Sequence, residues 1–298
     1  MQPMKESMIK TPVLAVLGLL TFAVHPAAQA QTLGHALPVA DEAMTKLSDA
    51  DLAKEMQNPV GGVISVPLEN RVDFGPGSLW RYTMNAQPVV PFEIQRDWLL
   101  VSRTILPVVY ASTPVGGEPS FDNVEVSALA NGPKRGGLGD ITQSFFLAPK
   151  EAMDGWIWGA GPVLRLPSAT REEFGQGRWG AGPTAVALRQ DGPWTYGMLA
   201  NHIWSFAGWG PENVNTTYLQ PFLAYTTDSL TTFSLGSETA YDWVQRQWVV
   251  PIDLGVSQLV RIGGMPLQLG LGARLYAERP DGGPNWGLSF TITFMFPK

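Results

Sequence analysis

The chain has 298 residues, 45% of them hydrophobic and only 15% charged, and its formal net charge is −6. Soluble domains usually carry about 25% charged residues, so this charge content is low for that class. The acidic balance and the lack of a Lys/Arg-rich stripe argue against nucleic-acid binding. The chain has no cysteine, which excludes disulfides, thiolate metal sites and a cysteine nucleophile. With only three histidines, we expect no metal site and no cofactor.

The N-terminus has the pattern of a secretory signal. Lys5 and Lys10 precede a short apolar run from Val13 to Val24, and Ala28-Gln29-Ala30 is a small-residue cleavage site. The run is shorter than the roughly 20 apolar residues that a spanning helix needs. We therefore predict a signal peptide over residues 1–30, cleaved near Ala30. Since no later window holds 18 uninterrupted apolar residues, the exported chain is either soluble or a β-barrel.

Residues 31–59 form a separate N-terminal segment with one predicted helix. Ser48 and Asp51 have the spacing of a capping box, and Asn58-Pro59 is a helix stop. The pattern predicts a helix over about 48–57. We expect it either to plug the lumen of a barrel or to lie at its periplasmic mouth.

From residue 60 to residue 298 the chain has the pattern of strands separated by turns. Most segments exceed the usual 5–6 residues of a globular strand, and lengths of ten or more suit a tilted strand that crosses a bilayer. The fold prediction is all-β, a transmembrane antiparallel up-and-down β-barrel of about 12 strands with one short N-terminal helix. The predicted strands are 61–74, 79–93, 97–111, 138–149, 155–168, 178–190, 193–207, 214–227, 230–241, 247–259, 265–279 and 285–296.

Several of these segments alternate between apolar and polar residues. In 285–296 every even-numbered residue is apolar or aromatic, and the odd-numbered ones are polar or glycine apart from Met295. Such a period places one face toward lipid and the other toward the lumen. The segments 97–111 and 178–190 are apolar on both faces, so their orientation stays open. Closure requires 285–296 to pair with 61–74, because unpaired backbone groups are not tolerated in hydrocarbon.

Loop lengths and tryptophans agree with an outer-membrane barrel. If both ends lie in the periplasm, the inner turns are short and the outer loops, including 112–137, are longer. Tryptophans follow inner turns and flank outer loops, as two interfacial girdles would. We expect outer-membrane lipids as neighbours and the barrel-assembly machinery as a partner during biogenesis. The alternative is a secreted soluble β-sandwich, which also alternates.

Segments along residues 55–298 resemble one family. They include "QNPVGGVISVPLENRVDFG", "GLGDITQSFFLAP", "WGAGPVLRLPSAT" and "RPDGGPNWGLSFTITFMFPK". These stretches are similar to the bacterial outer-membrane barrels grouped with the MetA protein of phenol-degradation pathways. The resemblance implies a transmembrane barrel of a Gram-negative outer membrane that passes hydrophobic or aromatic compounds. It implies no catalytic residues. Asn201-His202 departs from the Asn-Asn pair expected before the "WSFAG" motif, which puts a role for the second amide in doubt.

The sequence contains little evidence for a catalytic site. Outer-membrane phospholipases use a His and a Ser two positions apart on one strand face, but His202 and Ser205 are three apart and should face opposite ways. The glycine-rich stretches do not lie between a strand and a helix start, so we expect bulges and bends rather than phosphate binding. We therefore expect no enzyme.

Charged residues within the strands are the better candidates. A lipid-facing Arg or Lys costs about 2–4 kcal/mol at mid-membrane, so strand charges should point into the lumen. They would either brace a closed interior or line a path that selects a solute. We predict a narrow, passive channel for small molecules, hydrophobic or aromatic ones among them; the alternatives are a closed structural or adhesive barrel and a lipid hydrolase. The lumen-lining candidates are Glu69, Arg71, Asp73, Arg81, Arg103, Arg165, Glu238, Asp253, Arg274 and Glu278.

Overall fold

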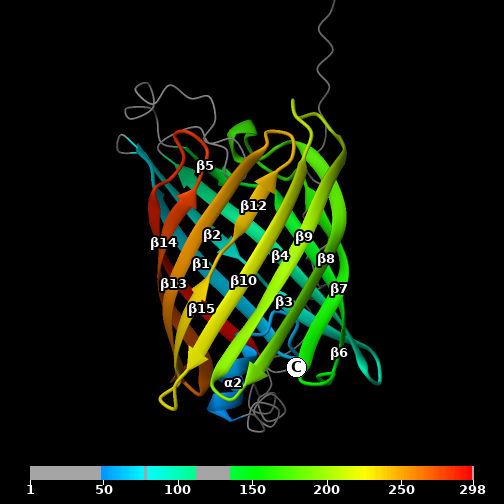
Figure 1. The fold of residues 1–298 in the computed structure, drawn as a ribbon, viewed down its shortest axis with the longest axis vertical. Coiled ribbons are helices and arrows are strands. Elements are labelled where there is room, and N and C mark those ends of the chain that lie inside the picture. Colours follow the sequence, from blue (N-terminus) through cyan, green and yellow to red (C-terminus); the bar gives the residue numbers. More distant parts are fainter. Residues whose placement is uncertain (1–47, 77–78, 112–134, 297–298) are drawn as a thin grey trace, which may run out of the picture. The chain divides into compact units, whose positions relative to one another are not determined.

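The computed structural model describes residues 48–76, 79–111 and 135–296, which form one closed antiparallel barrel (Figure 1). The predicted fold class is confirmed, with twelve strands built from fifteen strand segments. The predicted signal peptide over 1–30 lies outside the described residues, as does the rest of the chain before Ser48. Most of the predicted loop 112–137 is also outside them, but residues 135–137 are strand rather than loop.

The elements follow one another around the barrel in nearly sequential order. A short α-helix, α2 (Asp49–Glu55), precedes the strands, and a 3₁₀ turn, η4 (Glu172–Phe174), lies between β7 and β8. The strands are β1 (Ile64–Phe74), β2 (Trp80–Ala86), β3 (Val89–Gln95), β4 (Trp98–Ala111), β5 (Arg135–Leu138), β6 (Ile141–Pro149), β7 (Trp156–Leu166), β8 (Arg178–Asp191), β9 (Trp194–Gly208), β10 (Asn215–Thr226), β11 (Thr231–Gly236), β12 (Thr239–Asp242), β13 (Gln247–Ile262), β14 (Met265–Glu278) and β15 (Trp286–Phe296).

The barrel closes where β15 meets β1. The two strands pair antiparallel along their whole length, from Ile64 opposite Phe296 to Phe74 opposite Trp286. This is the closure that the sequence predicts. Because both strands are paired on both sides, neither leaves an open edge.

Three of the twelve strands are interrupted, which the sequence analysis did not anticipate. The predicted strand 79–93 divides into β2 and β3 at Gln87-Pro88, where proline cannot donate to the ladder. The predicted strand 230–241 divides into β11 and β12 at Ser237-Glu238, and β5 and β6 are divided at Gly139-Asp140. A break in the ladder turns local polar groups away from regular pairing, and Gln87, Asp140 and Glu238 all face a cavity described below.

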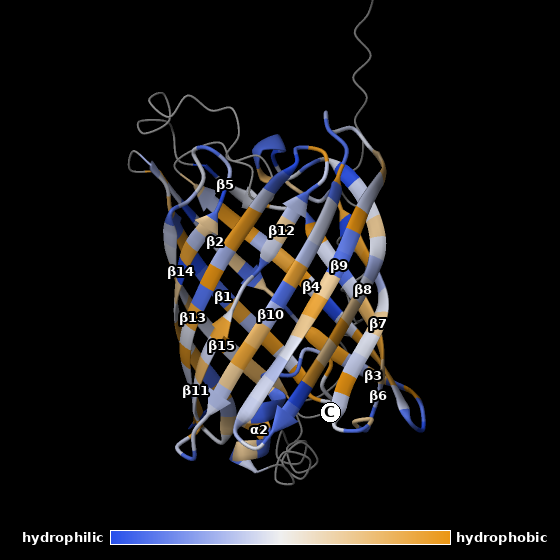
Figure 2. Ribbon diagram, in the orientation of Figure 1, coloured by the Kyte–Doolittle hydropathy of each residue, from blue (hydrophilic) through white to orange (hydrophobic). Residues whose placement is uncertain are grey.

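Short turns and longer connections lie at opposite ends of the barrel. The end with the turns after β3, β6, β8, β10 and β13 is called the short-turn end, and the other is the loop end. Aromatic pairs lie near both: Trp156 with Tyr196 near the short-turn end, and Trp80 with Tyr110 near the loop end. Figure 2 shows hydrophobic and hydrophilic positions alternating along the strands between these two belts.

The outer face of β15 is apolar, as its alternation predicts. Leu288 and Phe290 are exposed there, whereas Gly287 and Thr293 are buried on the inner face. Met295, the apolar exception on the inner face, is only 1% exposed and packs in a cluster with Leu52 of α2. The residue that breaks the alternation is therefore a contact for the helix.

Helix α2 lies at the short-turn end and packs against the inner wall (Figure 1). Ser48 caps it in the predicted capping box with Asp51, although the helix ends at Glu55 rather than near residue 57. Its buried Leu52 and Ala53 contact Met295, and Arg261 of β13 donates to Asp49 at 2.6 Å. No helix in the described ranges is long and apolar enough to cross a membrane.

Strands β4 and β8, whose orientation the sequence left open, are apolar on both faces because part of the interior is a packed core. Their inward residues, among them Val101 and Leu188, are completely buried. They meet Val60, which follows α2, so the N-terminal segment contributes to this core. The members of this inner apolar cluster are Val60, Val89, Leu99, Val101, Phe146, Ala148, Val186, Leu188 and Leu199.

Candidate functional site in the barrel interior

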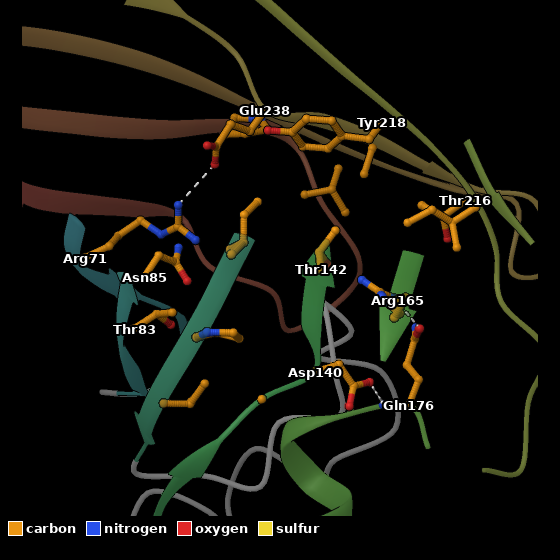
Figure 3. Close-up of a pocket in the computed structure, with 18 of the residues that line it drawn as sticks. Arg71, Thr83, Asn85, Asp140, Thr142, Arg165, Gln176, Thr216, Tyr218 and Glu238 are labelled. Carbon is orange, nitrogen blue, oxygen red and sulfur yellow. Dashed lines mark hydrogen bonds and ion pairs between the residues drawn. The ribbon is translucent and has the colours of Figure 1, made fainter. Parts of the chain in front are cut away.

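The interior holds a cavity near the loop end, here called the loop-end cavity, of about 220 Å³ (Figure 3). A buried water needs about 10–15 Å³ on this measure, so the cavity has room for a small organic molecule but not for a polypeptide segment. Apolar side chains such as Ile105 and Leu199 share its wall with hydroxyls and amides. Its charged lining residues are Arg71, Asp73, Arg81, Arg103, Asp140, Arg165, Glu238, Asp242 and Arg274.

A second space, here called the short-turn cavity, has a volume of about 300 Å³. Met56 and Gln57, just after α2, form one side of it. The facing wall carries small inward residues on β11, β13, β14 and β15, which leave room that larger side chains would fill. Those small residues are Ser234, Gly236, Gly255, Ser257, Gly270, Gly272, Ser289 and Thr291.

An ion-pair cluster separates the two cavities. Arg274 of β14 lies 2.6 Å from Glu238, and its Nη2 donates to the Asp253 carboxylate at 2.9 Å. Arg71 of β1 approaches the same Glu238 at 3.1 Å and Asp73 at 3.2 Å. Glu238 is thus shared by two guanidinium groups, as its place in the break between β11 and β12 allows. These five residues are called the ion-pair cluster.

Strand register explains why the cluster forms. Arg274 pairs with Asp253 across β13 and β14, and on its other side it pairs with Gly287 of β15. Asp73 of β1 also pairs with Gly287. A Cβ at position 287 would overlap the Asp73 carboxylate, so glycine provides the space across which charges from β1 and β14 approach. Tyr276 adds a hydrogen bond to Asp73 at 3.0 Å.

The ten residues predicted to line the lumen are distributed unevenly. Seven line the loop-end cavity: Arg71, Asp73, Arg81, Arg103, Arg165, Glu238 and Arg274. Glu69 and Asp253 line the short-turn cavity, which also includes Glu238 and Arg274. Glu278 is exposed and lines neither cavity, because it is the last residue of β14 at the loop end. Strand alternation places such residues on a face but gives no position along the barrel axis.

Sequence reasoning missed several polar residues that hold the arginines in place. Arg103 donates to Gln87 at 2.8 Å, and Arg165 donates to Gln176 in the loop after η4 (Figure 3). Asp140 accepts the backbone N–H of Gln176 at 2.8 Å. Pro88 is a signal in the sequence for the interruption beside Gln87. The contact between Arg165 and Gln176 could not be predicted from the sequence. It depends on how the loop between β7 and β8 folds at the mouth of the barrel.

The geometry gives no support to a catalytic His–Ser pair. Neighbouring Asn201 and Ile203 line the loop-end cavity, which places His202 on the outer face. There it contacts Trp204 and shares a 2.7 Å hydrogen bond with Thr217. Ser205 accepts the backbone N–H of Val214 instead. No group of three or more potential metal ligands occurs within the described part of the chain.

The pH dependence of α2 docking is a testable consequence of Glu55. Burial raises the pKa of its carboxyl above the ordinary 4.5, although the N–H of Gly62, at 2.6 Å, opposes the shift. The docked segment then binds a proton more readily than the undocked one. Docking is penalised above the docked-state pKa, and the penalty disappears as pH falls below 4.5. After correction for intrinsic rates, hydrogen exchange should show α2 better protected near pH 4 than near pH 7.

The matched variant for this experiment is Glu55→Gln, which keeps the shape and a hydrogen-bond acceptor. Its protection should change less with pH than that of wild type, because position 55 no longer carries a carboxyl to titrate. The same pH response in wild type and variant would refute the role of Glu55.

Comparison with known proteins shows the fold but no family. No protein-family model matches the chain, and no curated protein sequence matches it. Among solved structures, the COG4313 outer membrane channel from Pseudomonas putida F1 is similar, with 18% identity, a TM-score of 0.59, and coverage of 80% of this chain and 96% of that one. This likeness shows a shared barrel fold.

Two looser similarities have TM-scores below 0.5 and support no inference about this chain. The NanC porin is 12% identical, with a TM-score of 0.44 and coverage of 78% of this chain and 99% of that one. Outer membrane phospholipase A from Escherichia coli is 11% identical, with a TM-score of 0.45 and coverage of 78% and 89%.

Proposed function

We propose that the chain is an outer-membrane β-barrel that acts as a passive channel for small molecules. One observation carries the proposal: the cavities from the two ends share two lining residues, Glu238 and Arg274. The ion-pair cluster is therefore the boundary between them. A solute would pass along the small-residue wall of β11 and β13–β15, beside the inner apolar cluster, and would cross at Glu238.

The outer membrane as the location is part of this proposal. An apolar outer face between two aromatic belts suits a bilayer, and full backbone pairing satisfies the need for a closed wall. The predicted signal peptide and the sequence resemblance to MetA-like barrels support the same location. So does the shared fold with a solved outer membrane channel. Outer-membrane lipids and the assembly machinery are the proposed partners.

Small solutes with a hydrophobic or aromatic body are the proposed class. Ile105, Val109, Phe174 and Leu199 provide apolar surface in the loop-end cavity. The same wall carries convergent polar groups, and small-molecule sites combine apolar surface with polar groups that fix the orientation of the ligand. No reaction is assigned, because His202 and Ser205 occupy opposite faces of the wall.

Single-channel recording on the reconstituted full-length protein tests the proposal. Wild type should conduct, and Glu238→Ala should raise conductance about twofold or more by removing the side chain that divides the cavities. Glu278→Ala is the matched control, since it removes the same carboxylate from a residue that lines neither cavity. Its conductance should equal that of wild type.

A closed structural barrel is the second candidate, because the inner apolar cluster and α2 fill much of the short-turn half. It predicts no conductance and no solute flux in wild type or in Glu238→Ala. That result would contradict the channel proposal.

A further inference from the structure

We infer that the loop-end cavity binds small anions with a short apolar body, aromatic carboxylates being the simplest members of the class. This inference deepens the proposed function and rests on it for transport, but not for binding. It begins with two arginines, Arg103 of β4 and Arg165 of β7, which both line the cavity. Neither forms an ion pair with a carboxylate among the residues that the structure describes.

Both arginines are positioned by neutral groups. Gln87 accepts from Arg103 and Gln176 accepts from Arg165, each through an amide oxygen. An amide oxygen orients a guanidinium but leaves its charge unbalanced, and each guanidinium has five N–H donors. Arg165 is buried, and its Nε has no hydrogen-bond partner. Gln176 takes up one N–H of the Arg165 Nη1, and the remaining terminal N–H groups are the donors that a carboxylate in the cavity would satisfy.

The cavity's acidic groups are already engaged elsewhere. Asp140 accepts the backbone N–H groups of Ala169 and Gln176, and Asp242 accepts those of Val244 and Gln245. Asp73 and Glu238 belong to the ion-pair cluster on the other wall. Among the described residues, Arg103 and Arg165 therefore line the cavity without a carboxylate partner, opposite a wall where acids and arginines are paired.

The two arginines can reach one ligand. Arg103 pairs with Ser144 of β6, which pairs with Val163 of β7, two residues before Arg165. Strand spacing then puts the two Cα atoms roughly 12 Å apart, within the combined reach of two arginine side chains around a single ring. Apolar Ile105 lies beside them on the cavity wall and would contact the ring.

Equilibrium binding on the full-length protein in detergent tests the inference, with benzoate, neutral benzamide and cationic benzylamine as probes. By calorimetry, benzoate should bind at least tenfold more tightly than benzamide, and benzylamine should bind more weakly than either. The double variant Arg103→Gln and Arg165→Gln should lose at least tenfold in benzoate affinity while benzamide is unchanged. Arg178→Gln is the matched control, since Arg178 does not line the cavity.

Equal affinities of wild type for benzoate and benzamide would overturn the inference, and this comparison does not depend on any variant folding. A loss of benzoate binding as large in Arg178→Gln as in the double variant would overturn it too. Solute flux into vesicles distinguishes the two proposals. Flux of glycerol without a benzoate preference rejects the anion site and leaves the channel. Benzoate preference without any flux rejects the channel and leaves the site.

Discussion

Replacing Ala53 with aspartate is expected to open the short-turn end of the barrel. Ala53 has no exposed surface and lies in the apolar contact between α2 and the wall residues Leu259 and Met295. A carboxylate there would be buried without a partner, at a cost of at least ~3 kcal/mol. That is enough to shift the docked-to-undocked ratio of α2 more than a hundredfold. Single-channel conductance should rise several-fold, and the amides of residues 49–56 should lose exchange protection.

The same helix provides the control. Ala50→Asp introduces the same side chain at an exposed position one turn earlier, and it should leave conductance and protection unchanged. If Ala53→Asp lost protection in α2 without a change in conductance, the helix would not obstruct the path. If neither quantity changed, the contact of α2 with the wall would contribute little to its docking.

Replacing Arg274 with methionine is expected to destabilise the barrel by about 2–3 kcal/mol, because it leaves two partly buried carboxylates without their main partner. Arg274 is 7% exposed and pairs with both Glu238 and Asp253. Methionine keeps much of the side-chain volume, so the loss reports on charge rather than on a cavity. Urea unfolding in lipid vesicles, followed by tryptophan fluorescence, measures the change.

Two further variants sharpen this experiment. Arg178→Met removes an arginine near the loop end whose one hydrogen-bond acceptor among the described residues is the backbone carbonyl of Glu212, and it should cost less than about 1 kcal/mol. The double variant Arg274→Met and Asp253→Leu also removes one of the carboxylates left without a partner. It should therefore recover part of the lost free energy of unfolding. A cost for Arg274→Met no larger than that for Arg178→Met would show that the ion-pair cluster does not stabilise the fold.

The fold could be predicted from the sequence because strands in a barrel wall have a strict period of two. The alternation of odd and even positions was enough to predict the outer face of β15 and the inward positions of Arg81 and Arg274. It left the orientation of β4 and β8 open, because both faces of these strands are apolar; in the structure Val101 and Leu188 point inward. Period-two patterns assume a polar interior, and here a large part of the interior is a packed core.

Less of the candidate site could be predicted than of the fold. The residues of the ion-pair cluster were all expected to line the lumen, but their grouping depends on strand register and on a break at Glu238. Register is set by turns and pairing across the whole wall, and no local pattern reports it. The separation of Arg103 and Arg165 from the paired charges is likewise a property of the three-dimensional arrangement.

The contact between α2 and the last strand has a consequence for the order of assembly. Helix α2 precedes every strand that the structure describes, yet its docking site includes Met295 of β15 and Leu259 of β13. This helix is synthesised before those strands but cannot reach its final position until the last of them are in place. The N-terminal segment can dock only when the wall is essentially complete, so its docking would report that the barrel has finished folding.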